Sequence, residues 1–203
     1  MTANEITKEN DNDLKLVLAS SSPRREEILK QLKLKFTIVP SKINEENFTE
    51  DDPISLVRKL AVEKAKSVSN LVENALIIAA DTVVVYDNHI LGKPKNKSDA
   101  RRMLKMLRAK KHQVITGVAV VNSQDGEVHV DENITEVKMA DLTDTEIDTY
   151  IETGEPMDKA GSYAIQGFGA LFVEEIQGSF YSVMGLPIHQ LAKLLNNFDY
   201  GIL

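Results

Sequence analysis

The chain has 203 residues, of which 42% are hydrophobic and 27% are charged, and these proportions fit one ordinary globular domain with a proper core. Its formal net charge of −7 argues against a general nucleic-acid or acidic-membrane binder, because both need a basic surface. It has no cysteine, which excludes disulfides, thiolate metal sites and a cysteine nucleophile.

The first thirteen residues are polar and acidic and show no periodicity. We therefore expect a flexible tail over 1–13, followed by a single domain over 14–203. The tail does not have the pattern of a signal peptide, and no apolar run approaches the roughly 18 residues of a membrane span. These features predict a cytoplasmic protein with no membrane partner and no nucleic-acid partner.

The first predicted strand, 16–19, runs directly into the segment 20–26, SSSPRRE, where a helix begins. Ser22 is a good N-cap, and Pro23 suits the first helical position. The free N–H groups and the dipole of a helix start favour phosphate, and arginine adds a planar fork of donors. The segment predicts an anion site; the alternative is a capped surface helix with two solvated arginines.

Further along the chain, strand and helix patterns alternate. A polar, acidic loop over 40–52 precedes the second helix, and the apolar run 75–80 is typical of a strand buried on both faces. Thr143 to Glu146 forms a capping box, and Gly154 ends that helix. The predicted strands are 16–19, 36–39, 75–80, 83–86, 112–121, 127–139, 170–176 and 179–183, and the predicted helices are 23–32, 53–70, 98–107, 143–152 and one from 187 onward. This order predicts a mixed α/β fold, in which the last two strands form a hairpin about Gln177-Gly178.

One carboxylate stands inside this apolar pattern. Asp81 lies between Ala80 and Thr82, and a bare carboxylate there costs several kcal/mol unless a cation, a metal or hydrogen bonds compensate it. The alternative is a structural aspartate in a β-bulge, bonded to the backbone. Lys93 follows across a turn.

The segment 155–167, EPMDKAGSYAIQG, gathers an acid, a base, small residues and an amide. Glycines let the backbone approach a ligand closely, and the amide of Gln166 can read both donors and acceptors of a base. The alternative for Asp158-Lys159 is a surface ion pair.

The charged residues in these segments could act together in one reaction. Five basic side chains can neutralise a polyphosphate: Arg24, Arg25, Lys64, Lys93 and Lys159. Three acidic side chains can hold a divalent cation or activate water: Glu45, Asp81 and Asp158. Oxygen ligands without cysteine or clustered histidine favour Mg²⁺ or Mn²⁺. Hydrolysis of a phosphate ester or anhydride needs both parts, a charge clamp on the leaving phosphate and a base or metal for the attacking water.

Six motifs occur in order along the chain: LASxSPRR at 18–25, LAxEKA at 60–65, ADT at 80–82, LGKP at 91–94, DKAGxYxIQG at 158–167 and VMGLP at 183–187. Together they resemble the Maf family of nucleotide pyrophosphatases, over about 14–198. The resemblance implies an α/β fold like that of the inosine-triphosphate pyrophosphatases (Maf/Ham1), with a mixed central sheet flanked by helices in two lobes and a cleft between them. It also implies metal-dependent hydrolysis of nucleoside triphosphates to the monophosphate and diphosphate.

The resemblance further assigns roles to individual positions. Asp81 is implied to be the proton acceptor that activates water. The family's substrate-specificity positions fall on Arg24, Thr82 and Gln166, and the arginine and glutamine at these places resemble the branch acting on dTTP and UTP rather than the 7-methyl-GTP branch. The positions that match substrate-binding or phosphate-binding residues are Ser20, Arg25, Lys64, Lys93 and Lys159, and the implied metal ligands are Glu45, Asp81 and Asp158. A homodimer is a further expectation from the family.

Two other functions remain open on the sequence. One is a non-catalytic, nucleotide-binding regulator of septum formation, which needs the arginine turn but not Asp81. The other is a hydrolase of the same fold that acts on modified nucleotides. An aspartate retained in an apolar strand despite its cost favours catalysis.

Overall fold

The structure is a computed structural model and describes residues 14–203; the tail predicted over 1–13 lies outside the described residues. Within that range, seven strands form one mixed sheet in the order β2-β1-β3-β5-β6-β7, with β4 paired to β3. The strands are β1 Lys15–Leu18, β2 Phe36–Ile38, β3 Ala75–Tyr86, β4 His89–Leu91, β5 Lys111–Asn122, β6 Val128–Met139 and β7 Val173–Gln177.

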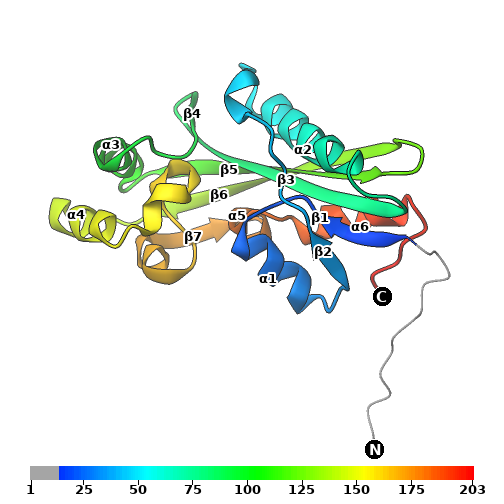
Figure 1. Ribbon diagram of the computed structural model, residues 1–203. Coiled ribbons are helices and arrows are strands. Elements are labelled where there is room, and N and C mark those ends of the chain that lie inside the picture. Colours follow the sequence, from blue (N-terminus) through cyan, green and yellow to red (C-terminus); the bar gives the residue numbers. More distant parts are fainter. Residues whose placement is uncertain (1–13) are drawn as a thin grey trace, which may run out of the picture.

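Helices cover both faces and one end of the sheet. Figure 1 shows α2 above one face, α5 and α6 on the other, and α3 and α4 beyond one end. The helices are α1 Pro23–Gln31, α2 Pro53–Ser69, α3 Lys97–Leu107, α4 Asp144–Glu152, α5 Phe180–Met184 and α6 Ile188–Asn196, and the 3₁₀ turns are η1 Glu45–Asn47, η2 Glu155–Asp158, η3 Ala160–Ser162 and η4 Gly167–Phe172. The predicted mixed α/β fold is confirmed. Among residues 14–203, no helix has the length and apolar character to cross a bilayer.

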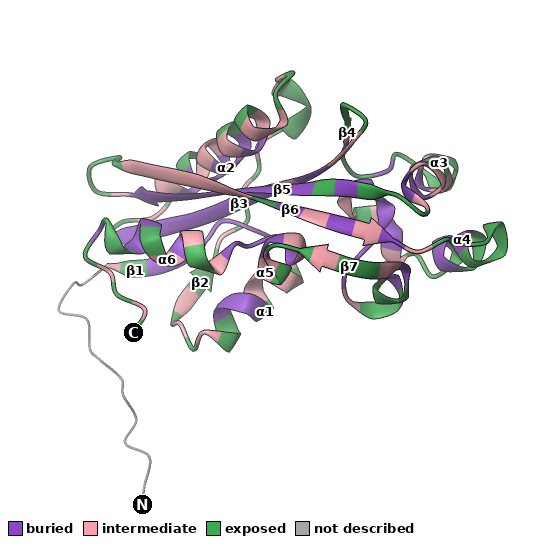
Figure 2. Cartoon of the chain, turned by 180° about the vertical axis from the view of Figure 1, so that it is seen from behind, coloured by how far each residue is buried: buried purple, intermediate pink, exposed green. Residues whose placement is uncertain are grey.

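The central strands are buried on both faces, as the purple stretch along β3 and β5 in Figure 2 shows. Successive side chains of a strand point to opposite faces. In β3, Leu76 and Ile78 pack in the core that contains α6, whereas Ile77 and Ala79 pack with the buried residues of α2. The same alternation directs Asp81 toward α2 and the next residue, Thr82, toward α5.

The strand break predicted around Asp81 is wrong. β3 is one strand of 12 residues, and it pairs with β5 without interruption, so that Asp81 lies opposite Gly117 and Thr82 opposite Thr116. This regular register also excludes the β-bulge alternative. The charge is accommodated by its surroundings and does not disturb the ladder.

The hairpin predicted about Gln177-Gly178 is also wrong. β7 pairs with β6, and the segment expected as its partner strand is the short helix α5. Gly178 has φ +136°, which turns the chain, and the Ser179 side chain then accepts a hydrogen bond from the Ser182 N–H as an N-cap. A cap of the same kind starts α3 at Lys97, one residue before the predicted 98, because the Asn96 side chain accepts a hydrogen bond from the Asp99 N–H.

The backbone of α2 lies close against the sheet at Gly117. A Cβ on Gly117 would lie 2.6 Å from the carbonyl carbon and oxygen of Val57 and 2.9 Å from the backbone nitrogen of Arg58. We therefore expect Gly117→Ala to lower the free energy of unfolding by about 1–3 kcal/mol, because helix backbone cannot move aside as a flexible side chain can. Denaturant unfolding measures the change. Gly92→Ala is the matched control, since a Cβ there meets nothing within 4 Å; equal midpoints for the two variants would contradict the prediction.

The strand order leaves an opening beside β3. β1 pairs with β3 only as far as Ile78, and β4 joins it only from Val84 onward. Between these pairings, residues 79–83 have no strand partner on that edge within the described part of the chain. The opening lies at the carboxyl end of β1, where ligands bind in open α/β sheets.

Candidate active site

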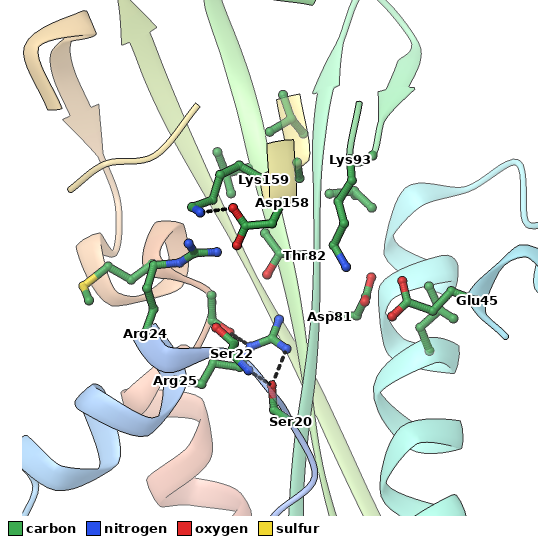
Figure 3. A pocket seen from close by; sticks show the side chains of 18 of the residues that line it. Ser20, Ser22, Arg24, Arg25, Glu45, Asp81, Thr82, Lys93, Asp158 and Lys159 are labelled. Atoms are coloured by element: carbon green, nitrogen blue, oxygen red, sulfur yellow. Dashed lines mark hydrogen bonds and ion pairs between the residues drawn. The ribbon is translucent and has the colours of Figure 1, made fainter. Parts of the chain in front are cut away.

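A cavity of about 410 Å³ lies at this opening, and Figure 3 shows charged side chains arranged around it. Its volume falls within the roughly 300–1,000 Å³ that is typical of small-molecule sites. Ten predicted site residues line it: Ser20, Arg24, Arg25, Glu45, Lys64, Asp81, Thr82, Lys93, Asp158 and Lys159. The structure thus brings together the separate charged segments of the sequence.

The α2 wall of the cavity contributes a buried lysine between two carboxylates. Lys64 Nζ lies 2.5 Å from an Asp81 carboxylate oxygen and 2.7 Å from Glu45 Oε1. Lys64 follows Leu60 and Ala61 on the buried face of a helix that begins at Pro53 and is capped by Asp52. The side chains of Lys64 and Asp81 are each only 10% exposed, so the ammonium group is the cation that compensates the buried aspartate.

The pKa values of the two carboxylates are shifted in opposite directions. Burial raises the pKa of Asp81 above its ordinary value, and the positive charge of Lys64 only partly offsets it. Burial acts in the same direction on Glu45, but the hydrogen bond and charge of Lys64, with Lys93 and Arg25, lower its pKa overall. A carboxylate of raised pKa is a stronger proton acceptor, which fits Asp81 for general base catalysis.

The three predicted metal ligands do not form one group. Glu45 and Asp81 share Lys64, whereas the Asp158 carboxylate pairs with Lys159. Residues 14–203 contain no cluster of three acidic or histidine side chains suited to a metal. Two carboxylates that line this cavity nevertheless fit Mg²⁺, which usually takes one or two carboxylates and completes its coordination with water and substrate phosphates.

The β1–α1 turn holds Arg25 in a fixed orientation. The Arg25 guanidinium donates from Nε to the Gly185 carbonyl at 2.8 Å and from Nη1 to Ser20 Oγ at 3.3 Å. Ser22 is the N-cap residue, as predicted, but its side chain makes no capping hydrogen bond; its N–H donates to Ser20 Oγ instead. Burial lowers the pKa of Arg25, and the Asp81 charge opposes that shift.

Arg24 lies on the opposite side of the cavity from Glu45, close to Asp158 and Lys159 (Figure 3). Burial lowers the pKa of Arg24, and the negative charge of Asp158 works against it. Asp158 is paired with Lys159, as in the surface ion pair considered from the sequence, but both residues line the cavity.

Gln166 is the predicted site residue that does not line the cavity, although its neighbours Ala164 and Ile165 do. It is half-buried and precedes η4. Its segment is held by Glu155, whose carboxylate accepts hydrogen bonds from the Phe168 and Gly169 N–H groups.

The sequence does not predict a buried hydroxyl–imidazole pair behind the cavity. The Tyr163 side chain lies in the wall, and its hydroxyl is 2.7 Å from His112 Nε2. Burial lowers the pKa of His112 to about 4, so the ring is neutral at physiological pH. The only sequence signal for this pair is that Tyr163 belongs to the motif at 158–167. His112 lies 51 residues away in the chain, so no local pattern links the two residues.

Comparisons with known proteins agree with this architecture. A family model described as Maf-like protein matches residues 15–198. The dTTP/UTP pyrophosphatase of Alkaliphilus metalliredigens is 50% identical over 183 residues, covering 90% of this chain and 95% of that protein. The dTTP/UTP pyrophosphatase of Dictyoglomus thermophilum is 47% identical over 189 residues, covering 93% and 98%.

A solved structure of a HAM1 protein from Coxiella burnetii shares the fold, with a TM-score of 0.50 and 16% identity over 91% of this chain and 99% of that one. The similarity in fold and the match over 15–198 agree with the order of the sequence motifs. The chain belongs to the Maf family.

Proposed function

We propose that this protein hydrolyses dTTP and UTP to the corresponding monophosphate and diphosphate. The observation that carries the proposal is a buried carboxylate of raised pKa, Asp81, in a cavity whose other charged groups are mainly cationic. Relatives that are 44–50% identical over at least 90% of this chain carry the name dTTP/UTP pyrophosphatase. A nucleoside triphosphate is therefore the substrate.

In the proposed reaction, water attacks the α-phosphorus and the bond from that phosphorus to the β-phosphate oxygen breaks. Asp81 accepts a proton from the attacking water, and Lys64 holds the carboxylate in place and favours its ionised form. Arg25, Lys93 and Lys159 lower the energy of the transition state by neutralising charge on the phosphates.

Glu45 and Asp81 are the residues that would hold a divalent cation, Mg²⁺ or Mn²⁺. When bound, the cation supplies positive charge to the phosphate oxygens in addition to that of the protein's own cations. Asp158 lies with Lys159 and Arg24, and we assign it to the substrate side of the cavity. We assign selection of the base to Arg24 and Thr82, which line the cavity, and to Gln166, which directly follows the lining residues Ala164 and Ile165. The cytoplasmic location and the homodimer remain predictions.

A nucleotide panel with pyrophosphate detection tests the proposal. We expect dTTP and UTP to be hydrolysed faster than CTP and 7-methyl-GTP, and we expect a chelator to abolish pyrophosphate release. Including 5-methyl-UTP separates the canonical from the modified pyrimidine substrates. Binding of UTP without pyrophosphate release in the presence of Mg²⁺ or Mn²⁺ would instead support the non-catalytic regulator.

A further inference from the structure

Two threonine hydroxyls connect the cavity to the interior of the protein. Thr82 lines the cavity and lies directly opposite Thr116 in the pairing of β3 with β5. The two Oγ1 atoms are 2.9 Å apart, and Thr116 Oγ1 is also 2.9 Å from the carbonyl oxygen of Ser182 in α5. Thr116 is completely buried, so solvent cannot replace either partner.

The number of protons in this chain of contacts fixes the direction of each hydrogen bond. A carbonyl oxygen only accepts, so Thr116 must donate to Ser182. A hydroxyl has one proton, and this bond uses that of Thr116. The contact between the threonines therefore has Thr82 as its donor, and the remaining lone pairs of Thr82 Oγ1 can accept a hydrogen bond in the cavity.

We propose that Thr116 is a positioning residue that makes Thr82 a pure hydrogen-bond acceptor toward the nucleotide. An acceptor at this position pairs with a base that carries an N–H donor at N3, as the imides of uracil and thymine do. Cytosine has a lone pair at N3 instead, so the two acceptors would face each other without a proton. The inference rests on the proposed function and deepens it to a class of base.

The position of Thr82 in the fold supports a contact with the base. Asp81 and Lys64 lie on the α2 face of the sheet, whereas Thr82 points to the α5 face. Figure 3 accordingly shows Thr82 between Asp81 and the side of the cavity where Arg24 and Asp158 lie. An acceptor-only hydroxyl also repels phosphate oxygens, which directs the triphosphate toward the cations.

The test compares UTP with CTP in Thr116→Val, which keeps the shape of the side chain and removes its hydroxyl. Thr82 then loses its inner acceptor, and its proton is free to turn into the cavity. We expect the ratio of kcat/KM for UTP over CTP to fall about tenfold. The preference for binding UMP over CMP, measured by calorimetry, should fall in parallel, and Thr116→Ser should restore both.

Thr135→Val is the matched control. Thr135 is also completely buried, and its hydroxyl contacts the Ser179 carbonyl just before α5, but it does not line the cavity. This variant should keep the parent's UTP to CTP ratio even where it lowers stability. If Thr116→Val folds poorly, Thr82→Val provides the second test, because it removes the acceptor itself and should abolish the same preference.

The outcomes separate this inference from the proposed function. An unchanged UTP to CTP ratio in folded Thr116→Val, or equal binding of UMP and CMP by the parent protein, would overturn the inference. If the parent releases no pyrophosphate but prefers UMP, and Thr116→Val loses that preference, then the proposed function fails and the inference stands.

Discussion

The Asp81→Asn variant is expected to release pyrophosphate from UTP about 1,000-fold more slowly than the parent protein. The amide occupies nearly the same volume but cannot take a proton from water, and general base catalysis typically contributes about 10²–10⁴-fold. The fold should persist, because Lys64 retains its ion pair with Glu45 at 2.7 Å. Steady-state kinetics should show the loss mainly in kcat, since the cations that bind phosphate remain.

Asp87→Asn is the control for this substitution. Asp87 is exposed in the turn that follows β3, and its φ of +49° is a conformation that asparagine tolerates. The Asp87→Asn variant should release pyrophosphate at the parent's rate. Pyrophosphate release by Asp81→Asn within tenfold of the parent would remove Asp81 from its proposed role, whereas a large drop in melting temperature would assign the loss to folding.

Long, regular patterns in the sequence predict their elements well. The helical periodicity of 53–70 and the strand patterns over 112–139 correspond to α2, β5 and β6, because each element buries a face that its own residues define. The break expected at Asp81 fails for a different reason. Lys64 compensates the buried charge from 17 positions earlier in the chain, and no local pattern reveals that contact.

The segment after Gly178 shows the limit of local propensity. Its residues FYSVM are typical of a strand, yet they form α5. The Ser179 cap and the packing of Met184 in the core with α6 and β1 outweigh that preference. This helix and its C-cap residue then supply the Ser182 and Gly185 carbonyls that orient Thr116 and Arg25.

The sequence predicts which residues belong to the site better than it predicts which of them contact each other. All but one of the predicted site residues line the cavity, because the segments that carry them meet at the opening beside β3. Which acid contacts which base depends on long-range packing, so the sequence groups Asp158 with Glu45 although it pairs with Lys159. The role of Thr116 is likewise invisible in the sequence, where it is one more β-branched residue of a buried strand.

Replacing Arg25 by lysine is expected to lower kcat/KM for UTP about 100-fold. Lysine keeps the positive charge, but it lacks the planar set of five N–H donors. Arg25 uses Nε for the Gly185 carbonyl and Nη1 for Ser20, and this anchoring aims the rest of the guanidinium at the cavity. Loss of one preorganised donor to a developing charge typically costs about 10²–10³-fold in rate.

Arg58→Lys is the control for Arg25→Lys. It distinguishes the loss of guanidinium donors at the site from a general effect of replacing arginine by lysine. Arg58 lies on α2, and its Nη1 contacts Glu132 at 2.9 Å outside the cavity lining, so this variant should match the parent within about twofold, as expected for a partly exposed ion pair remote from the site. A parental kcat/KM in Arg25→Lys would mean that charge alone binds the phosphates. The hydrogen bonds to Gly185 and Ser20 would then only stabilise the junction between the β1–α1 turn and α5.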